Sequence, residues 1–147
     1  ALSFHKGEIM KRLISVVVLF VVMTGCASQM EREHETGALN ATEAWLDLLD
    51  KDDTENLWAV TSQIAKDRYE KDFYLKYLQG KRKMLGKVIN RDLQYNWTLE
   101  LFQGSLPDGT HRRIMYWTEY ENRELAKELI IITLEEGQWK VVEWQLK

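Results

Sequence analysis

The sequence predicts an α+β domain in which N-terminal helices pack on one face of a curved, four-stranded antiparallel sheet. Between residues 41 and 85, apolar residues recur at steps of three and four, which is the period of a helix. Beyond Gly86 the step becomes two, which is typical of strands. Short turns separate these strands, so consecutive strands are expected to pair antiparallel, and helices followed by such strands indicate the α+β class.

Residues 10–25 have the pattern of a secretory signal peptide. The basic pair Lys11 and Arg12 precedes a run that is apolar from Leu13 to Met23 except for one serine. The run is shorter than the roughly 20 residues of a membrane-spanning helix, and small residues follow it. A buried strand or helix is the alternative, but it leaves the basic start unexplained. Residues 1–9 precede a complete signal, so we interpret them as an extension or a mis-set start.

The motif Met23-Thr24-Gly25-Cys26 resembles the lipobox of bacterial lipoproteins, with Met23 in place of the usual leucine. The resemblance implies cleavage before Cys26, diacylglycerol on its sulfur and an acyl chain such as palmitate on its new amine. Each buried methylene adds about 0.8 kcal/mol, so two or three chains would anchor the protein to a membrane. An unmodified thiol is the alternative. Ala27, in place of aspartate, resembles signals for the outer rather than the inner membrane, where two membranes exist.

The remaining chain is predicted to be an acidic domain on a tether. The whole chain has 20 cations and 23 anions, and the removed part holds three cations and one anion, which leaves a net charge of −5. This charge argues against nucleic acid as a partner. Cys26 is the only cysteine, so no disulfide is expected. Residues 26–38 are polar and predict a lipidated tether, and residues 39–147 predict one globular domain.

Three helices are predicted. The first carries an apolar stripe from Ala41 to Leu49 and stops at an acidic turn, where Asp52 and Glu55 resemble a capping box. The second covers about residues 54–61. The third runs from residue 64 or 66 to Leu85, with Gly80 as a kink and Gly86 as a left-handed cap.

Four strands are predicted after Gly86. In residues 93–102, Leu93, Tyr95, Trp97, Leu99 and Leu101 alternate with polar residues, which predicts a strand with one buried face. A turn at Leu106-Pro107-Asp108-Gly109-Thr110 leads to a second strand over about residues 111–121. The third and fourth, residues 127–135 and 138–146, are joined by a turn at Gly137.

The last two strands are apolar on both faces. Trp139 and Trp144 are separated by an odd number of residues, so strict alternation places them on opposite faces. A plain antiparallel sheet has one wet face. Either curvature of the sheet buries both faces, which we favour, or one tryptophan marks a binding face for a ligand or partner.

Several short motifs follow one another along the domain: Trp45 with the acidic turn, Trp58, Arg82 with Met84-Leu85-Gly86, Arg91, Leu106-Pro107-Asp108-Gly109, Tyr116 and Gly137-Gln138-Trp139-Lys140-Val141. In their order and spacing, these motifs resemble the bacterial domain-of-unknown-function family 4019, which is often found on lipoproteins. The resemblance covers about residues 39–147 and implies a topology similar to the cystatin-like, nuclear-transport-factor-2-like fold. It implies no activity, because the family has none assigned.

No group of residues in the sequence indicates a reaction. His111 is the only histidine of the domain, and one histidine makes neither a zinc site nor a catalytic dyad. The acidic turn Asp50, Asp52 and Asp53 lacks the glycine and distal glutamate of a calcium loop, so helix capping is the preferred interpretation. We therefore expect no enzyme, no metal and no cofactor.

The cations near the end of the third helix are the strongest remaining candidate site. Lys81, Arg82, Lys83 and Lys87 could contact an anion or lipid headgroups beside the membrane. A solvated helix end is the preferred alternative. Arg82 and Arg91 match positions of the family, so they are also expected to pair with carboxylates inside the domain.

These patterns predict an envelope-exposed lipoprotein. Its membrane contact is the lipid on Cys26, and its domain is expected to bind an unknown envelope protein or small ligand without catalysis. The alternative is a small-ligand-binding or enzymatic domain that uses a cavity between helix and sheet.

Overall fold

The computed structural model describes residues 28–99 and 106–147, in two units. Residues 28–34 belong to the first unit and are helical. In the second unit, Glu35–Lys147, the helix continues to residue 50 and is called the N-terminal helix below. Among the described residues, no helix is both long and apolar enough to span a membrane.

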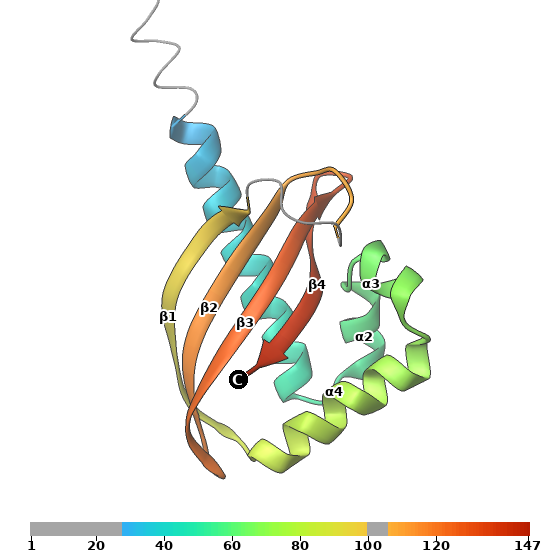
Figure 1. The fold of residues 1–147 in the computed structure, drawn as a ribbon, viewed down its shortest axis with the longest axis vertical. Helices are drawn as coiled ribbons and strands as arrows, with labels where there is room; N and C mark the ends of the chain where they lie inside the picture. The colour runs from blue at the N-terminus through green and yellow to red at the C-terminus, as the bar shows by residue number, and fades with distance from the viewer. Residues whose placement is uncertain (1–27, 100–105) are drawn as a thin grey trace, which may run out of the picture. The chain divides into compact units, whose positions relative to one another are not determined.

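Three further helices and four strands complete the second unit, so the predicted α+β class is confirmed. The helices are α2 (Thr54–Ala59), α3 (Gln63–Arg68) and α4 (Lys71–Leu85), and the strands are β1 (Val88–Leu99), β2 (His111–Tyr120), β3 (Arg123–Glu135) and β4 (Gln138–Leu146). The strands pair in the order β1-β2-β3-β4, each antiparallel to the next. In Figure 1 the N-terminal helix crosses one face of the bent sheet, and α2 to α4 lie on the side of β4.

The N-terminal helix extends further back than the apolar stripe predicts. Residues 28–38, expected to be a tether, are helical, and Ala38 is completely buried. A Cβ atom placed on Gly37 would lie 3.1 Å from Cδ1 of Trp139, so the helix lies very close to β4 at this point. Gly37 and Ala38 carry no large side chain, which permits this close approach. For the same reason the segment has no apolar stripe, so the sequence pattern did not predict a helix there.

Hydrogen bonds at the acidic turn end the N-terminal helix. Asp52 has φ of 60°, and the amides of Asp52 and Asp53 donate to the carbonyls of Leu49 and Leu48. This is the Schellman pattern, with aspartate at the position that usually holds glycine. The cap of α2 is Asp53 rather than Asp52, because its carboxylate accepts a hydrogen bond from the amide of Asn56 at 3.3 Å.

The predicted third helix is two helices. Tyr69 and Glu70 have extended backbone angles, and the Glu70 carboxylate caps α4 by accepting from the amides of Asp72 and Phe73. Gly80 lies inside α4 without interrupting it. Gly86 ends α4 with the predicted positive φ, 77°, but its ψ of −163° is extended rather than left-handed helical.

A bulge in β1 reverses the predicted faces of that strand beyond Leu93. The register with β2 shifts between Leu93 and Tyr95. Arg91 before the bulge and Asn96 after it both contact the N-terminal helix, through Asp50 and the carbonyl of Glu35. Trp97, predicted to be buried, is 62% exposed. Residues 100–102 of the predicted strand lie outside the described residues.

A second bulge corrects the prediction for the two tryptophans of β4. Ile131 pairs with Glu143 and Ile132 with Val141, so Val142 is an extra residue in β4. The extra residue changes the parity of the strand, so Trp139 and Trp144 both face the helices and pack with the hydrophobic core. The two strands therefore do not place these tryptophans on opposite faces.

Candidate functional site

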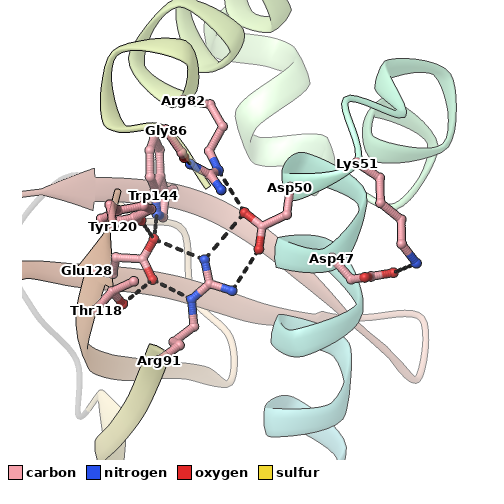
Figure 2. Close-up of polar contacts among 10 residues, drawn as sticks. All are labelled: Asp47, Asp50, Lys51, Arg82, Gly86, Arg91, Thr118, Tyr120, Glu128 and Trp144. Atoms are coloured by element: carbon pink, nitrogen blue, oxygen red, sulfur yellow. Dashed lines mark hydrogen bonds and ion pairs between the residues drawn. The ribbon is translucent and has the colours of Figure 1, made fainter. Parts of the chain in front are cut away.

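A buried carboxylate, Glu128, lies at the centre of a polar cluster (Figure 2). One carboxylate oxygen accepts from Nε of Arg91 at 2.6 Å and from the hydroxyl of Thr118 at 2.7 Å. The other accepts from the hydroxyl of Tyr120 and from the indole of Trp144 at 3.3 Å. These donors stabilise the charged form of a group that would otherwise be costly to bury.

Asp50 extends this cluster to the end of the N-terminal helix. Its carboxylate accepts from Nε of Arg82 at 2.7 Å and from a terminal nitrogen of Arg91 at 2.9 Å. Arg82 also donates to the carbonyl of Gly86. Burial lowers the pKa of Arg91, but hydrogen bonds and charges of Glu128 and Asp50 outweigh burial and raise it. The predicted internal pairing of Arg82 and Arg91 with carboxylates is confirmed.

This cluster links the elements of the second unit, and it leaves no room for a ligand at Glu128. Its members come from the N-terminal helix, α4 and all four strands. Burial and the charge of Glu128 both raise the pKa of Tyr120, so its phenol stays protonated and continues to donate. We therefore assign the cluster to the architecture of the domain. Sequence reasoning missed Glu128, although a charge between inward-facing Ala126 and Ile130 was a usable signal.

Three of the four cations proposed as an anion site line one hollow, in which carboxylates accompany them. Arg82 points into the cluster just described, with 11% of its side chain exposed. Lys81 lies over the ring of Tyr77, 4.5 Å from its centroid. Arg82, Lys83 and Lys87 line one hollow, together with the acidic residues Asp50, Asp52 and Glu121. The hollow thus holds three cationic and three anionic side chains, so it offers an anion no excess of positive charge.

A groove between α4 and β4 is the best candidate site. Its volume is about 390 Å³, within the range of small-ligand sites. The wall from α4 presents Phe73 and Tyr77, which are 62% and 46% exposed, and the opposite wall is β4 from Val142 to Lys147. Exposed aromatic rings next to a concavity are typical of binding surfaces.

Tyr74 gives the groove an unsatisfied polar group. The residue is 5% exposed and lines the groove, and its hydroxyl has no hydrogen-bond partner among the described residues. Its ring stacks on Tyr69, with 5.5 Å between centroids. Burial, with smaller contributions from Tyr69 and Glu143, raises the pKa of Tyr74, so the phenol is neutral at pH 7. A buried phenol normally has a partner, and a ligand in the groove could supply it.

The remaining candidates have structural partners or lie outside the described residues. The ring of His111 is buried, and its Nε2 lies 2.8 Å from the carbonyl of Pro107. The acidic turn diverges: Asp50 contacts arginines, Asp52 accepts from Gln79, and Asp53 caps α2. Cys26 lies outside the described residues.

Sequence reasoning missed the groove because its two walls are far apart in the chain. Phe73, Tyr77 and Lys81 are spaced four apart, so they share one side of α4. This aromatic row, beside the core row of Tyr74 and Leu78, was the available signal. Trp144, predicted as part of a binding face, also lines the groove, although it is only 4% exposed.

Comparison with known families gives one match. The model of the family described as "Protein of unknown function (DUF4019)" matches residues 41–144. No curated protein and no solved structure matches the chain.

Proposed function

The chain belongs to the DUF4019 family, and we propose that it is a cell-envelope lipoprotein whose domain binds a ligand or partner without catalysis. The proposed anchor is lipid on Cys26, and the proposed location is the outer membrane. The basic, apolar and Gly-Cys order of residues 10–26 supports the anchor. The groove between α4 and β4 supports the binding role.

The observation that carries the binding role is the combination of exposed aromatic rings and a buried, unpartnered phenol in one groove. Phe73 and Tyr77 offer apolar area at the surface, and Tyr74 offers a hydrogen-bond donor below it. Apolar walls with a few polar groups describe most small-ligand and peptide sites. A neutral Tyr74 is a donor rather than a base, so it favours recognition over proton abstraction.

An apolar fluorescent anion, 8-anilinonaphthalene-1-sulfonate, tests the groove with the full chain in detergent. We expect Phe73→Ser to weaken saturable dye binding by about tenfold, because a large ring leaves the wall. The matched control is Leu125→Ser, because Leu125 lies on β3 away from the groove and is 60% exposed, against 62% for Phe73. Equal binding by wild type and both variants would refute the groove as the binding site.

The anchor is tested separately. Cys26→Ser should abolish incorporation of labelled palmitate and move the protein from the membrane to the soluble fraction, because the sulfur is the predicted attachment atom. Ser28→Cys in the Cys26→Ser background is the control, since a cysteine at that position no longer follows Gly25. Label recovered on the Cys26→Ser protein would contradict the proposal.

A further inference from the structure

The groove runs along an open edge of the sheet. β4 is the last strand of the sheet and pairs with β3 along one edge; on its other edge, the described residues form a bridge only at Val141, with Thr61. Six consecutive residues of β4 and the chain after it, 142–147, line the groove. Side chains of consecutive strand residues point to alternate faces, so a wall of consecutive residues is the backbone edge rather than one face.

The hydrogen-bond pattern shows which backbone groups face the groove. Lys127 and Lys147 exchange two hydrogen bonds, each of 3.0 Å. In an antiparallel pair, bonded and non-bonded positions alternate, so Gln145 and Glu143 also bond to β3. The N–H and C=O groups of Trp144 and Leu146 therefore point away from β3. No described residue pairs with these four groups, which form a template for another strand.

We propose that the groove binds an extended peptide segment of another protein, which adds to β4 as a fifth strand. This inference rests on the proposed binding function and names the ligand class. Unpaired backbone groups at two alternate residues are complementary to another extended backbone. The side chains of such a segment alternate, so every second residue would meet Phe73 and Tyr77 across the groove.

Charge and the unpartnered phenol further define the segment. Among the described side chains that line the groove, Lys81 and Lys147 are cationic and Glu143, which accepts from Gln145 at 2.7 Å, is anionic, so the side chains leave an excess of one positive charge. An acidic residue in the peptide would meet this positive excess. A peptide carbonyl would also give the Tyr74 hydroxyl an acceptor. The expected ligand has apolar residues at alternate positions and at least one carboxylate.

The surroundings of β4 favour a single strand over a second copy of the domain. At the start of the open edge, the amide of Ser62 donates to the carbonyl of Val141 at 2.9 Å, and Thr61 forms a bridge with the same residue. From there on, α4 forms the other wall of the groove. An occupant is thus confined between the edge of β4 and the helix α4. An extended segment fits there, whereas a folded domain would collide with α3 and α4.

The test begins by selecting random phage-displayed peptides on the full chain in detergent. Selected peptides are synthesised with a fluorescent label, and their affinities are measured by anisotropy. A scan with N-methyl groups along a peptide follows, since each methyl removes one N–H. We expect a period of two: methylation should weaken binding about tenfold at residues bonded to β4 and less than about twofold at their neighbours.

Variants of the protein test the same backbone hydrogen bonds by changing β4 instead of the peptide. Leu146→Pro removes an outward N–H but no bond to β3, and proline is tolerated at such edge positions. Leu146→Ala is the matched control, because it removes the side chain and keeps the N–H. We expect proline to weaken peptide binding about tenfold more than alanine. If the proline variant does not fold, the N-methyl scan on wild type decides alone.

Failure of this inference differs from failure of the proposed function. Dye binding that depends on Phe73 while no peptide is selected, or while the N-methyl scan shows no period, would overturn strand addition and keep the groove as a site. If the protein forms a dimer that is dissociated by the peptides and abolished by Leu146→Pro, a second copy is the occupant. That result would also overturn strand addition by another protein. If neither Phe73→Ser nor Leu146→Pro changes the affinity of the peptides, they bind outside the groove, and strand addition is overturned. Dye binding insensitive to Phe73→Ser would refute the proposed function itself.

Discussion

At the scale of single residues, backbone angles and side-chain space decide which positions tolerate change. Gly86 and Gly137 have nearly the same φ, 77° and 78°. Around Gly137, a Cβ atom would meet nothing within 4 Å, whereas at Gly86 it would lie 2.9 Å from Cβ of Glu121. Gly86 also combines positive φ with extended ψ, a region that is essentially restricted to glycine. Gly86 therefore adds an extended ψ and a steric conflict to the positive φ that both glycines share.

Gly86→Ala should lower the free energy of unfolding by about 2–3 kcal/mol, and Gly137→Ala by about 1 kcal/mol. Both variants carry the strain of positive φ, but only the first brings a methyl group against Glu121. Urea unfolding of both proteins, followed by circular dichroism, measures the difference. Equal losses would show that Glu121 moves away without cost.

At the scale of elements, the bulges and the helix caps determine what each segment contacts. The extra residue Val142 turns Trp144 to the same side as Trp139. α3 is attached to the sheet through its N-terminus, where the Ser62 hydroxyl donates to Glu135 at 2.7 Å and the Gln63 amide donates to the same carboxylate at 3.1 Å. One extra residue in β4 thus sets the face of Trp144, and one carboxylate, Glu135, holds the N-terminus of α3 against the sheet.

Trp139→Ala and Trp144→Ala should both destabilise the protein by about 3–5 kcal/mol, because both rings pack with the core. Trp144→Ala should lie at the upper end, since it also removes an indole donor from Glu128. Trp97→Ala serves as the control: its ring is 62% exposed, and a change within about 0.5 kcal/mol is expected. A loss for only one of the β4 tryptophans would contradict the bulge.

Glu135 should make the stability of the protein depend on acidic pH. Burial raises its pKa, but hydrogen bonds from Ser62, Gln63 and Ile64 and the charge of Lys140 outweigh burial, so its pKa falls below the ordinary 4.5. The charged form is then favoured by folding. Its contribution is fully present above pH 4.5 and is lost as the pH falls through the lowered folded pKa.

We therefore expect Glu135→Gln to be less stable than wild type at pH 7, with the difference shrinking below about pH 4.5. Thermal melts across this range measure the difference. Glu124→Gln, at an exposed residue of β3, should show little change at any pH. A constant difference between wild type and Glu135→Gln down to pH 2 would rule out this role of Glu135.

At the scale of the whole molecule, the buried cluster around Glu128 joins helices and strands that are far apart in the chain. Arg91 of β1 contacts Asp50 of the N-terminal helix and Glu128 of β3, and Arg82 brings in α4 (Figure 2). Such a cluster is sensitive, because removal of one partner leaves a buried charge without compensation. The groove depends on the same arrangement, since its two walls are α4 and β4.

A double-mutant cycle measures this coupling. Arg91→Met and Glu128→Met should each cost about 3–5 kcal/mol, and the double variant should cost less than their sum, because it removes both charges together. The exposed pair Lys51 and Asp47, 2.7 Å apart and also drawn in Figure 2, is the control. Its coupling energy should be about 0.5 kcal/mol or less. Additive losses for the buried pair would contradict the proposed coupling.

The sequence by itself determined the α+β class, the order of the elements and most of their positions, because periodicity and turn residues act within short segments. It also indicated that Arg82 and Arg91 pair with carboxylates. Tertiary structure decided the faces of β1 and β4, the position of Glu128 and the groove. A bulge shows only when one strand is aligned with its partner, so alternation counted along β4 placed Trp139 and Trp144 wrongly. Likewise, the walls of the groove and the donors to Glu128 come from distant segments, and only their packing brings them together.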